Sequence, residues 1–430
     1  MTLFQYRHWV HLHLTAAGVI AVTSVAALAT SFPRPVATDQ TATRAWAQLA
    51  MLDGTPDAGD GLGTSVAISG NTVVASAPQS ETNLGVVDLF VKPTNGWTNM
   101  TETAKLTASD GTIDDGFGLS VAISGNVVVV GAPYFNSGGN QFQGKAYVYV
   151  KPATGWRDMT ETAQLTASDG VTDSELFSTV SISGNTIVAG EPGLSLIAYV
   201  FVKPTGGWKN MTETAKLTAS DNPKKAGGYH AVAISGNTII AGEPARVGKQ
   251  TAVYLYVKPA NGWSDMTQTA KLTPHFYGGE GRFGEALSIS GNTVAVGAPG
   301  AEAGFRHTQP RGAVYVFVEP TGGWKDMTEN ATLFASTGTP ADNFATSVSI
   351  SGNTVVAGAS LAQPTSGGTA YVFTRPRRGW PKKMTETAAL TASDGQPNYF
   401  FGTSVSINAG TILIGAPGHP LYGRCYLFGR

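Results

Sequence analysis

The chain has 430 residues, of which 42% are hydrophobic and 13% charged, so it can bury a large core, and intrinsic disorder is excluded. Its formal net charge of −1 excludes a global field that would attract nucleic acid or an acidic membrane surface, and a polyanionic partner would need a local basic patch. Cys425 is the single cysteine, which excludes an intramolecular disulfide and a cysteine-rich zinc site.

Residues 1–29 are predicted to be a signal peptide. Arg7 precedes an apolar run over 14–29, and Ala27-Leu28-Ala29 is the small-x-small pattern that signal peptidase cleaves. An uncleaved membrane anchor is the alternative, because the run can be extended to about 18 residues, near the lower limit for a span. Residues 30–43 are predicted to be a linker. In either case we expect the remaining chain to be secreted or at the cell surface, with a membrane as partner only if the anchor is retained.

The rest of the chain is built from one repeat. The marker Ile-Ser-Gly-Asn recurs six times, and a degenerate seventh copy reads Ile407-Asn408-Ala409-Gly410. The six markers end at Asn71, Asn126, Asn185, Asn237, Asn292 and Asn353. Self-similarity at about 50 to 60 residues is typical of a propeller or a solenoid.

Each unit is predicted to contain four short strands. Gly125-Asn126 is a two-residue hairpin turn in the second unit, and Gly131-Ala132-Pro133 ends the second strand because proline cannot donate to a ladder. The strands carry apolar or small residues on both faces, so each sheet must be covered on both sides, as neighbouring propeller blades do. The strands predicted for this unit are 117–124, 127–130, 145–150 and 163–167.

The two chain ends predict how the ring closes. Residues 45–52 match a fourth strand such as 104–108, yet no unit precedes them. The last unit stops after a third strand at 425–428. Pairing the two ends removes two open sheet edges. We therefore expect an all-β fold over 44–430: a seven-bladed β-propeller of four-stranded antiparallel blades, closed by an N-terminal strand that completes the last blade.

The units carry an FG dipeptide near the first strand and a GAP tripeptide after the second. The clearest examples are Phe117-Gly118 with Gly131-Ala132-Pro133, Phe283-Gly284 with Gly297-Ala298-Pro299, and Phe401-Gly402 with Gly415-Ala416-Pro417. This pattern resembles FG-GAP repeat proteins, the units of the integrin α-subunit head. The resemblance implies a seven-bladed propeller that binds proteins or glycans, commonly at a cell surface.

Calcium sites of the integrin type are not expected in this chain. Integrin-like repeats often hold calcium in a DxDxDG loop between the first and second strands. Here that loop is a short Ser-Gly-Asn-Thr turn without a carboxylate, whereas calcium takes six to eight oxygen ligands. Neither a metal nor another cofactor is predicted.

Differences among the repeats indicate where recognition takes place. The interval from the marker to the GAP proline is constant, as in Ile123 to Pro133, whereas the interval from that proline to the next tryptophan varies. The second-to-third-strand loop absorbs this variation, and in a propeller it lies on the same side as the crossover between blades. Loops on a rigid scaffold are the usual place for recognition.

The residues predicted to bind ligand lie in these loops and are mostly aromatic or charged. Such a mix suits glycan stacking or an acidic protein surface, although exposed loops also collect polar residues without function. We therefore expect a non-catalytic recognition or adhesion module for an extracellular protein or glycan, with no nucleic-acid partner. A structural extracellular repeat and a polysaccharide-acting enzyme are the alternatives. The candidates are Glu191, Tyr229, His230, Glu243, His275, Tyr277, Arg282, Phe305, Arg306, His307, His419 and Tyr422.

Glu191 and Glu243 replace the alanine of GAP in adjacent units. Paired carboxylates can perform acid/base chemistry, depending on their separation. No nucleophile or metal signature accompanies them, so we interpret them as solvated strand ends or as partners of Lys224, Arg246 or Lys249, and no enzyme is predicted.

Three other repeated features have structural interpretations. The aspartates of the SDG pattern, such as Asp110, are explained by Asp-Gly turns. The regular tryptophans, such as Trp156, are expected to pack between blades. A basic cluster on the face opposite the candidate ligand residues is interpreted as solvated, with contact to an anionic surface as the alternative. The cluster consists of Arg375, Arg377, Arg378, Lys382 and Lys383.

Overall fold

The computed structural model describes most of the chain after residue 44, in one compact unit, Ala45–Arg430. The predicted signal peptide and linker lie outside the described residues. Within the described part, no helix has the length and apolar character needed to cross a bilayer. The described ranges are 45–55, 61–79, 84–136, 141–170, 172–191, 196–221, 231–243, 251–275, 281–302, 311–362, 367–420 and 422–430.

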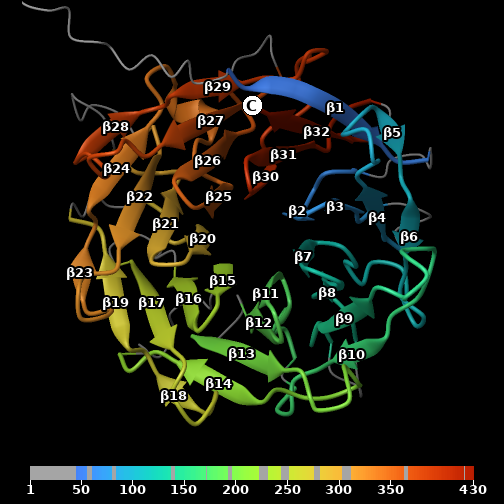
Figure 1. The fold of residues 1–430 in the computed structure, drawn as a ribbon. Coiled ribbons are helices and arrows are strands. Elements are labelled where there is room, and N and C mark those ends of the chain that lie inside the picture. Colours follow the sequence, from blue (N-terminus) through green and yellow to red (C-terminus); the bar gives the residue numbers. More distant parts are fainter. Residues whose placement is uncertain are drawn as a thin grey trace, which may run out of the picture. The chain divides into compact units, whose positions relative to one another are not determined.

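Seven small antiparallel sheets surround a central axis, as predicted, and the first strand of each blade lies innermost (Figure 1). Blade 1 contains β2 (Val66–Ser69), β3 (Thr72–Ala77), β4 (Val86–Val91) and β6 (Ala104–Leu106). Blade 2 contains β7 (Ser120–Ser124), β8 (Val127–Ala132), β9 (Lys145–Val150) and β10 (Ala163–Leu165). Blade 3 contains β11 (Thr179–Ser183), β12 (Thr186–Gly190), β13 (Ile197–Val202) and β14 (Ala215–Thr218). Blade 4 contains β15 (Ala231–Ser235), β16 (Thr238–Glu243), β17 (Ala252–Val257) and β19 (Ala270–Thr273).

The remaining blades follow the same order. Blade 5 contains β20 (Ala286–Ser290), β21 (Thr293–Ala298), β22 (Ala313–Val318) and β24 (Ala331–Phe334). Blade 6 contains β25 (Val348–Ser351), β26 (Thr354–Ala359), β27 (Thr369–Thr374) and β29 (Ala388–Leu390), preceded by a 3-10 turn, η1 (Pro340–Asp342). Blade 7 contains β30 (Ser404–Asn408), β31 (Thr411–Ala416), β32 (Arg424–Gly429) and the N-terminal β1 (Ala47–Asp53). Four short strands extend neighbouring sheets: β5 (Met100–Thr101), β18 (Met266–Thr267), β23 (Met327–Thr328) and β28 (Lys383–Thr385).

The FG dipeptide lies before the first strand, which therefore starts later than predicted. In blade 2 the strand begins at Ser120, because Gly118 has a φ of 92° that breaks the extended backbone. Phe117 turns inward and is buried, with its ring 5.4 Å from that of Tyr147 in an edge-to-face arrangement. The dipeptide thus joins the crossover to the blade and anchors it in the core.

FG and GAP positions meet across the blade boundaries for which both are described. A Cβ atom added to Gly131 of the blade 2 GAP would lie 2.1 Å from the carbonyl oxygen of Phe177, the phenylalanine preceding the first strand of blade 3. A side chain at this position would collide with the next blade's backbone, so only glycine allows the close approach. The recurrence of both motifs therefore follows from the way that identical blades stack.

The core lies between blades. Trp156 of blade 2 packs with Val87 and Leu89 of blade 1, and Trp208 of blade 3 packs with Val148 of blade 2. The predicted packing role of the tryptophans is confirmed.

The loop that follows each tryptophan clamps the preceding blade, and the interval from the tryptophan to the fourth-strand leucine is nine residues in five units and ten in blade 6. Met159 of blade 2 forms a parallel bridge with Leu106 of blade 1. Two residues later, Glu161 accepts hydrogen bonds from the backbone N–H (3.0 Å) and the hydroxyl (2.6 Å) of Ser109. Blade 6 has one more residue after its tryptophan and keeps the same contacts, with Met384 opposite Leu333 and Ser336 bonded to Glu386.

The N-terminal strand closes the ring as predicted. β1 pairs antiparallel with β32, from Ala47 opposite Gly429 to Leu52 opposite Cys425. At the innermost turn of the same seam, Gly70 of blade 1 donates its N–H to the Asn408 side chain of blade 7 at 3.1 Å.

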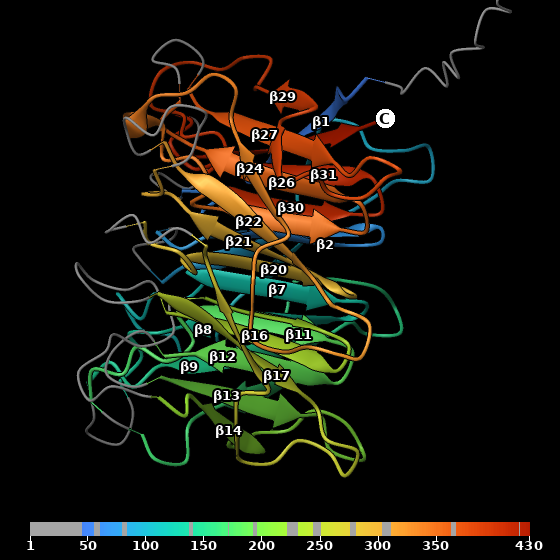
Figure 2. The ribbon, with the colours of Figure 1, turned by 90° about the vertical axis from the view of Figure 1, so that its left-hand side faces the viewer.

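The strands run between two faces of the ring, as the side view shows (Figure 2). We call the end with the Gly-Asn hairpin turns and the tryptophan loops the turn face. We call the opposite end, with the second-to-third-strand loops and the crossovers, the loop face. The predicted ligand residues that the structure describes belong to the loop face.

Candidate functional site

The two kinds of loop on the loop face bond to each other. In blade 2, the N–H of Tyr134 in the second-to-third-strand loop donates to the Asp115 carbonyl in the crossover at 3.0 Å. In blade 7, Gly418 donates to the Tyr399 carbonyl at 3.1 Å. Each pair therefore forms one surface over its blade.

The SDG aspartates hold the crossovers onto the third strands. Asp110 accepts hydrogen bonds from the Tyr147 hydroxyl (2.9 Å) and from Lys145 Nζ (2.7 Å), both on β9. In blade 7, Asp394 is bonded to Tyr426 (2.8 Å) and Arg424 (2.6 Å) in the same way. The expected role in turns was therefore incomplete. The tyrosine and the basic residue are distant in sequence, so the local pattern could not reveal them.

In the blade 2 contact the aspartate stays ionised and the tyrosine stays neutral. Burial raises the pKa of Asp110, but hydrogen bonds from Lys145 and Tyr147 outweigh it and leave that pKa below its ordinary value. Burial and the hydrogen bond to Asp110 raise the pKa of Tyr147 far above that of a free phenol. The carboxylate thus remains an acceptor and the phenol a donor throughout the neutral pH range.

Glu191 and Glu243 are buried, so the expectation of solvated strand ends was wrong. Their exposed fractions are 2% and 6%, and each faces a third-strand tyrosine. Long hydrogen bonds join Tyr199 to Glu191 (3.4 Å) and Tyr254 to Glu243 (3.5 Å). Glu243 is the last residue of β16 and Glu191 directly follows β12, and at this level the side chain points into the blade, which strand alternation alone did not show. The other expected partners, Lys224, Arg246 and Lys249, lie outside the described residues.

Glu191 changes charge close to neutral pH. Its pKa is raised to about 7. Burial is the main cause; the hydrogen bond from Tyr199 opposes the rise, and the nearby charge of Asp169 adds to it. The Tyr199 hydroxyl also lies 3.3 Å from Asp169, so two carboxyl groups share one donor. Neither Glu191 nor Glu243 lines the central channel described below.

His419 is buried in blade 7 beneath the loop face. Its ring centroid lies 4.5 Å from that of Tyr399, and its Nε2 lies 3.6 Å from Asp394. Burial and the charge of Arg424 lower its pKa below the ordinary value for histidine, so it is largely neutral at pH 7. Tyr422 follows in the same loop and is partly exposed, and its carbonyl accepts the N–H of Leu62 in blade 1 at 2.9 Å.

Arg282 and His275 are exposed on the loop face. Arg282 has a positive φ of 51° and forms an ion pair with Glu285 at the channel mouth. Burial raises the pKa of Glu285, and the Arg282 charge opposes this. The other six candidates lie outside the described residues: Tyr229, His230, Tyr277, Phe305, Arg306 and His307.

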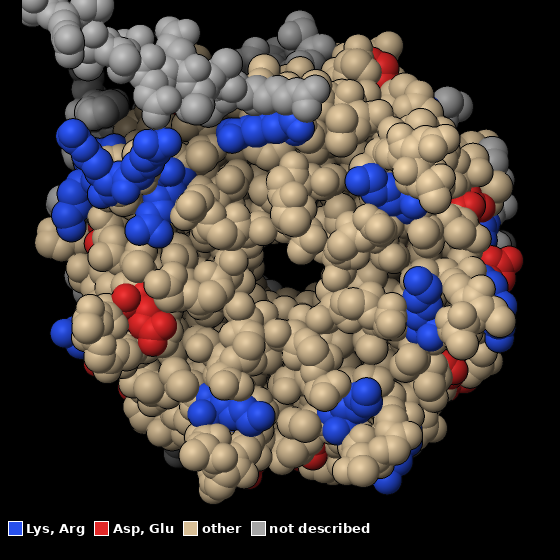
Figure 3. Space-filling model, viewed as in Figure 1, with Lys and Arg blue, Asp and Glu red and all other residues tan. Residues whose placement is uncertain are grey.

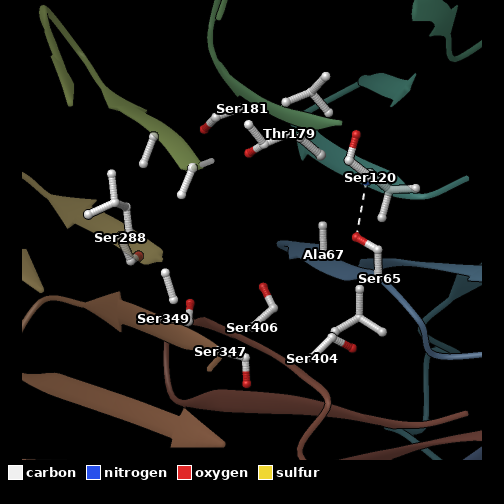
Figure 4. A pocket seen from close by; sticks show the side chains of 18 of the residues that line it. Ser65, Ala67, Ser120, Thr179, Ser181, Ser288, Ser347, Ser349, Ser404 and Ser406 are labelled. Carbon is white, nitrogen blue, oxygen red and sulfur yellow. Dashed lines mark hydrogen bonds between the residues drawn. The ribbon is translucent and has the colours of Figure 1, made fainter. Parts of the chain in front are cut away.

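A channel of about 420 Å³ runs between the innermost strands, and it was not predicted from the sequence. Its hydroxyl groups hold neighbouring blades: Ser65 accepts the N–H of Val121 and Ser349 that of Ile407, both at 3.1 Å. The alternation of serine with apolar residues in the first strands was its only signal. Figure 4 shows side chains that line it, among them Ser65, Ala67, Ser120, Thr179, Ser181, Ser288, Ser347, Ser349, Ser404 and Ser406.

Within the described ranges, no group of three or more His, Cys, Asp or Glu side chains is arranged to hold a metal ion.

Comparison with protein families matches the FG-GAP repeat model to residues 100–149, 266–317, 327–373 and 384–428. The first match starts at β5 and runs through β9, so a repeat consists of the clamp and fourth strand of one blade and three strands of the next. The contact at Gly131 joins the first matched repeat to Phe177, which lies outside the matched ranges. The chain is an FG-GAP repeat β-propeller.

FG-GAP repeats occur in extracellular and cell-surface proteins and typically form non-enzymatic propellers. A search of the curated proteins found no match to this propeller. Among solved structures, it is similar to the crystal structure of the computationally designed Ika8 protein, in crystal packing No. 1 in P63. That likeness has 16% identity and a TM-score of 0.48, and covers 89% of this chain and 99% of the other.

Proposed function

We propose that this FG-GAP propeller is a secreted or cell-surface recognition or adhesion module, which binds an extracellular protein or glycan through its loop face without catalysis. The observation that carries the proposal is the contrast between the two faces. Connections on the turn face have nearly constant length because they clamp adjacent blades. Length and composition vary on the loop face, and loops on a rigid scaffold are the usual place for recognition.

The longest variable loop can change without disturbing its blade. The carbonyl of Ala301 accepts hydrogen bonds from the N–H groups of Arg311 and Gly312, both at 3.1 Å. These bonds close the base of the loop between β21 and β22. Residues 302–310 can therefore be replaced without removing these two bonds.

The exposed candidates fit a polar or acidic ligand. Arg282 and His275 are exposed, and Tyr422 is partly exposed. A guanidinium group binds carboxylates in bidentate fashion, and aromatic faces stack on sugar rings. Glu191, Glu243 and His419 are buried, so in this proposal they support the loops and the exposed residues make the contact.

The test begins with binding of the intact protein to a glycan array and to immobilised extracellular matrix proteins. Replacing residues 302–310 with a shorter linker, or substituting Arg282→Ala, should weaken binding. Melting should stay unchanged after the loop replacement, because halving a loop alters its closure entropy by only about 0.6 kcal/mol. Asn95→Ala, at an exposed tip on the turn face, is the matched control. Binding that survives both loop-face changes but is lost in Asn95→Ala would contradict the proposal.

A further inference from the structure

A ring of basic residues occupies the turn face. In each blade, the residue immediately after the third strand holds the same position, and in six blades its backbone N–H donates to the asparagine carbonyl of the hairpin turn at 2.8 or 2.9 Å. Six of the seven residues at this position are basic, and blade 5 has Glu319 instead. We call the six the basic ring: Lys92, Lys151, Lys203, Lys258, Arg375 and Arg430.

These charges are available to a partner. Lys203 and Arg430 are exposed, and Lys92, Lys151 and Lys258 are partly exposed. Among the ion pairs within the described ranges, none involves these five residues.

The blade 6 cluster adds to the ring at one edge. Arg377, Arg378, Lys382 and Lys383 are exposed beside Arg375. Figure 3 shows blue side chains distributed around the turn face, gathered most densely over β24, β27 and β28, with few red ones between them. Because the whole chain has a net charge of only −1, this face carries a local positive excess.

The N-terminal segment joins the propeller at the same face. β1 begins with Ala47 opposite Gly429, and the guanidinium carbon of Arg430 lies 4.5 Å from the ring centre of Trp46. The described chain therefore enters β1 from the turn face.

We propose that the turn face docks on an anionic lipid bilayer. A ring of single charges around a broad face matches a planar anionic surface better than a threadlike polyanion, which is bound along a groove. Each basic residue near such a surface strengthens binding about fivefold, and salt weakens the attraction. Glu319, at the seventh equivalent position, is the unfavourable charge on this face. Docking would leave the loop face directed away from the lipid, and it does not depend on what the loop face binds.

The experiment measures partition of the full chain onto phosphatidylcholine vesicles with and without phosphatidylserine. Glu319→Lys should strengthen binding to the anionic vesicles about fivefold or more. Glu302→Lys makes the same charge change at an exposed position on the loop face, and it should leave binding unchanged. The triple variant Lys92→Gln, Lys151→Gln, Lys203→Gln should bind roughly a hundredfold more weakly. Binding to neutral vesicles should be equal in all variants, because the apolar segment is the same in each.

Three outcomes would overturn the proposal. An equal gain for Glu319→Lys and Glu302→Lys would show that net charge alone governs binding. Lipid binding that is unaffected by the triple variant would show that the ring makes no contact. Binding to dextran sulfate that follows the ring, without corresponding changes on vesicles, would assign the face to a soluble polyanion. A melting curve for each variant confirms that it is folded.

Discussion

Gln48 exchanges two hydrogen bonds with Ser393 across the seam between blade 7 and blade 6. The Gln48 side-chain amide donates to the Ser393 hydroxyl, and the Ser393 N–H donates to the Gln48 side-chain oxygen, both at 3.0 Å. Gln48 precedes Ala50 by two residues, as Glu161 precedes Ala163, and Glu161 binds Ser109 in the corresponding way. The N-terminal segment therefore supplies the clamp of the last seam as well as its missing strand.

Substitution at Gln48 tests this clamp. Gln48→Ala should lower the free energy of unfolding by about 0.5 to 1.5 kcal/mol, because both bonds to Ser393 are lost at an exposed site. Gln48→Glu should retain stability, since the N–H and hydroxyl of Ser393 can both donate to a carboxylate. Chemical denaturation measures both variants. An equal loss in the two would show that the clamp does not contribute.

A second prediction concerns the FG-to-GAP contact that closes the ring. A Cβ atom at Gly415 would lie 2.0 Å from the Gly63 carbonyl oxygen of blade 1, so Gly415→Ala must displace backbone at the seam. We expect a loss of about 1 to 3 kcal/mol or more, seen as a lower melting temperature. Gly338→Ala is the control, because its added Cβ would lie 3.4 Å from the nearest atom. Similar effects at both positions would contradict the proposed close approach.

Stability should depend on pH through Glu191. Its pKa of about 7 in the folded state exceeds its ordinary value of 4.5, so the folded state binds the extra proton between these values. This contribution is complete below pH 4.5 and is lost as the pH rises through 7, with a maximum of about 3 kcal/mol. The melting temperature of the unmodified protein should therefore fall relative to Glu191→Gln over this range.

The comparison with Glu191→Gln is necessary because His419 acts in the opposite direction. Burial lowers the pKa of His419, so its protonation favours the unfolded state. This destabilising contribution disappears as the pH rises through the ordinary histidine value of 6.5. Subtracting the two melting profiles removes this contribution. A difference that stays constant with pH would contradict the assignment to Glu191.

Metal removal provides a fourth prediction. The hairpin turns contain glycine and asparagine without a carboxylate, so they offer too few oxygen ligands for calcium. A chelator should leave the melting temperature unchanged within error. A decrease of several degrees that calcium reverses would reveal a structural site.

Features encoded within a few residues could be predicted from the sequence. The Gly125-Asn126 turn, the proline stops and the apolar strands determined blade number and strand order, because turn chemistry and periodicity are local. The closing strand could also be predicted, since counting strands at the two ends left one missing and one in excess. Its clamp was not predicted, because Gln48 and Ser393 are separated by 345 residues and only the closed ring brings them together.

The tertiary structure decided which side chains are accessible. Glu191 and His419 lie near loops in sequence, yet third strands and crossovers cover them, and this burial sets their pKa values. The basic cluster of blade 6 was visible as a run of neighbours, whereas the ring from Lys92 to Arg430 was not. Its members lie in six different blades, and closure alone places them on one face. The sequence by itself determined the blades, because turns and strand periodicity are local. The arrangement of the blades around the axis determined which charged and buried side chains lie together, because charge and packing act through space.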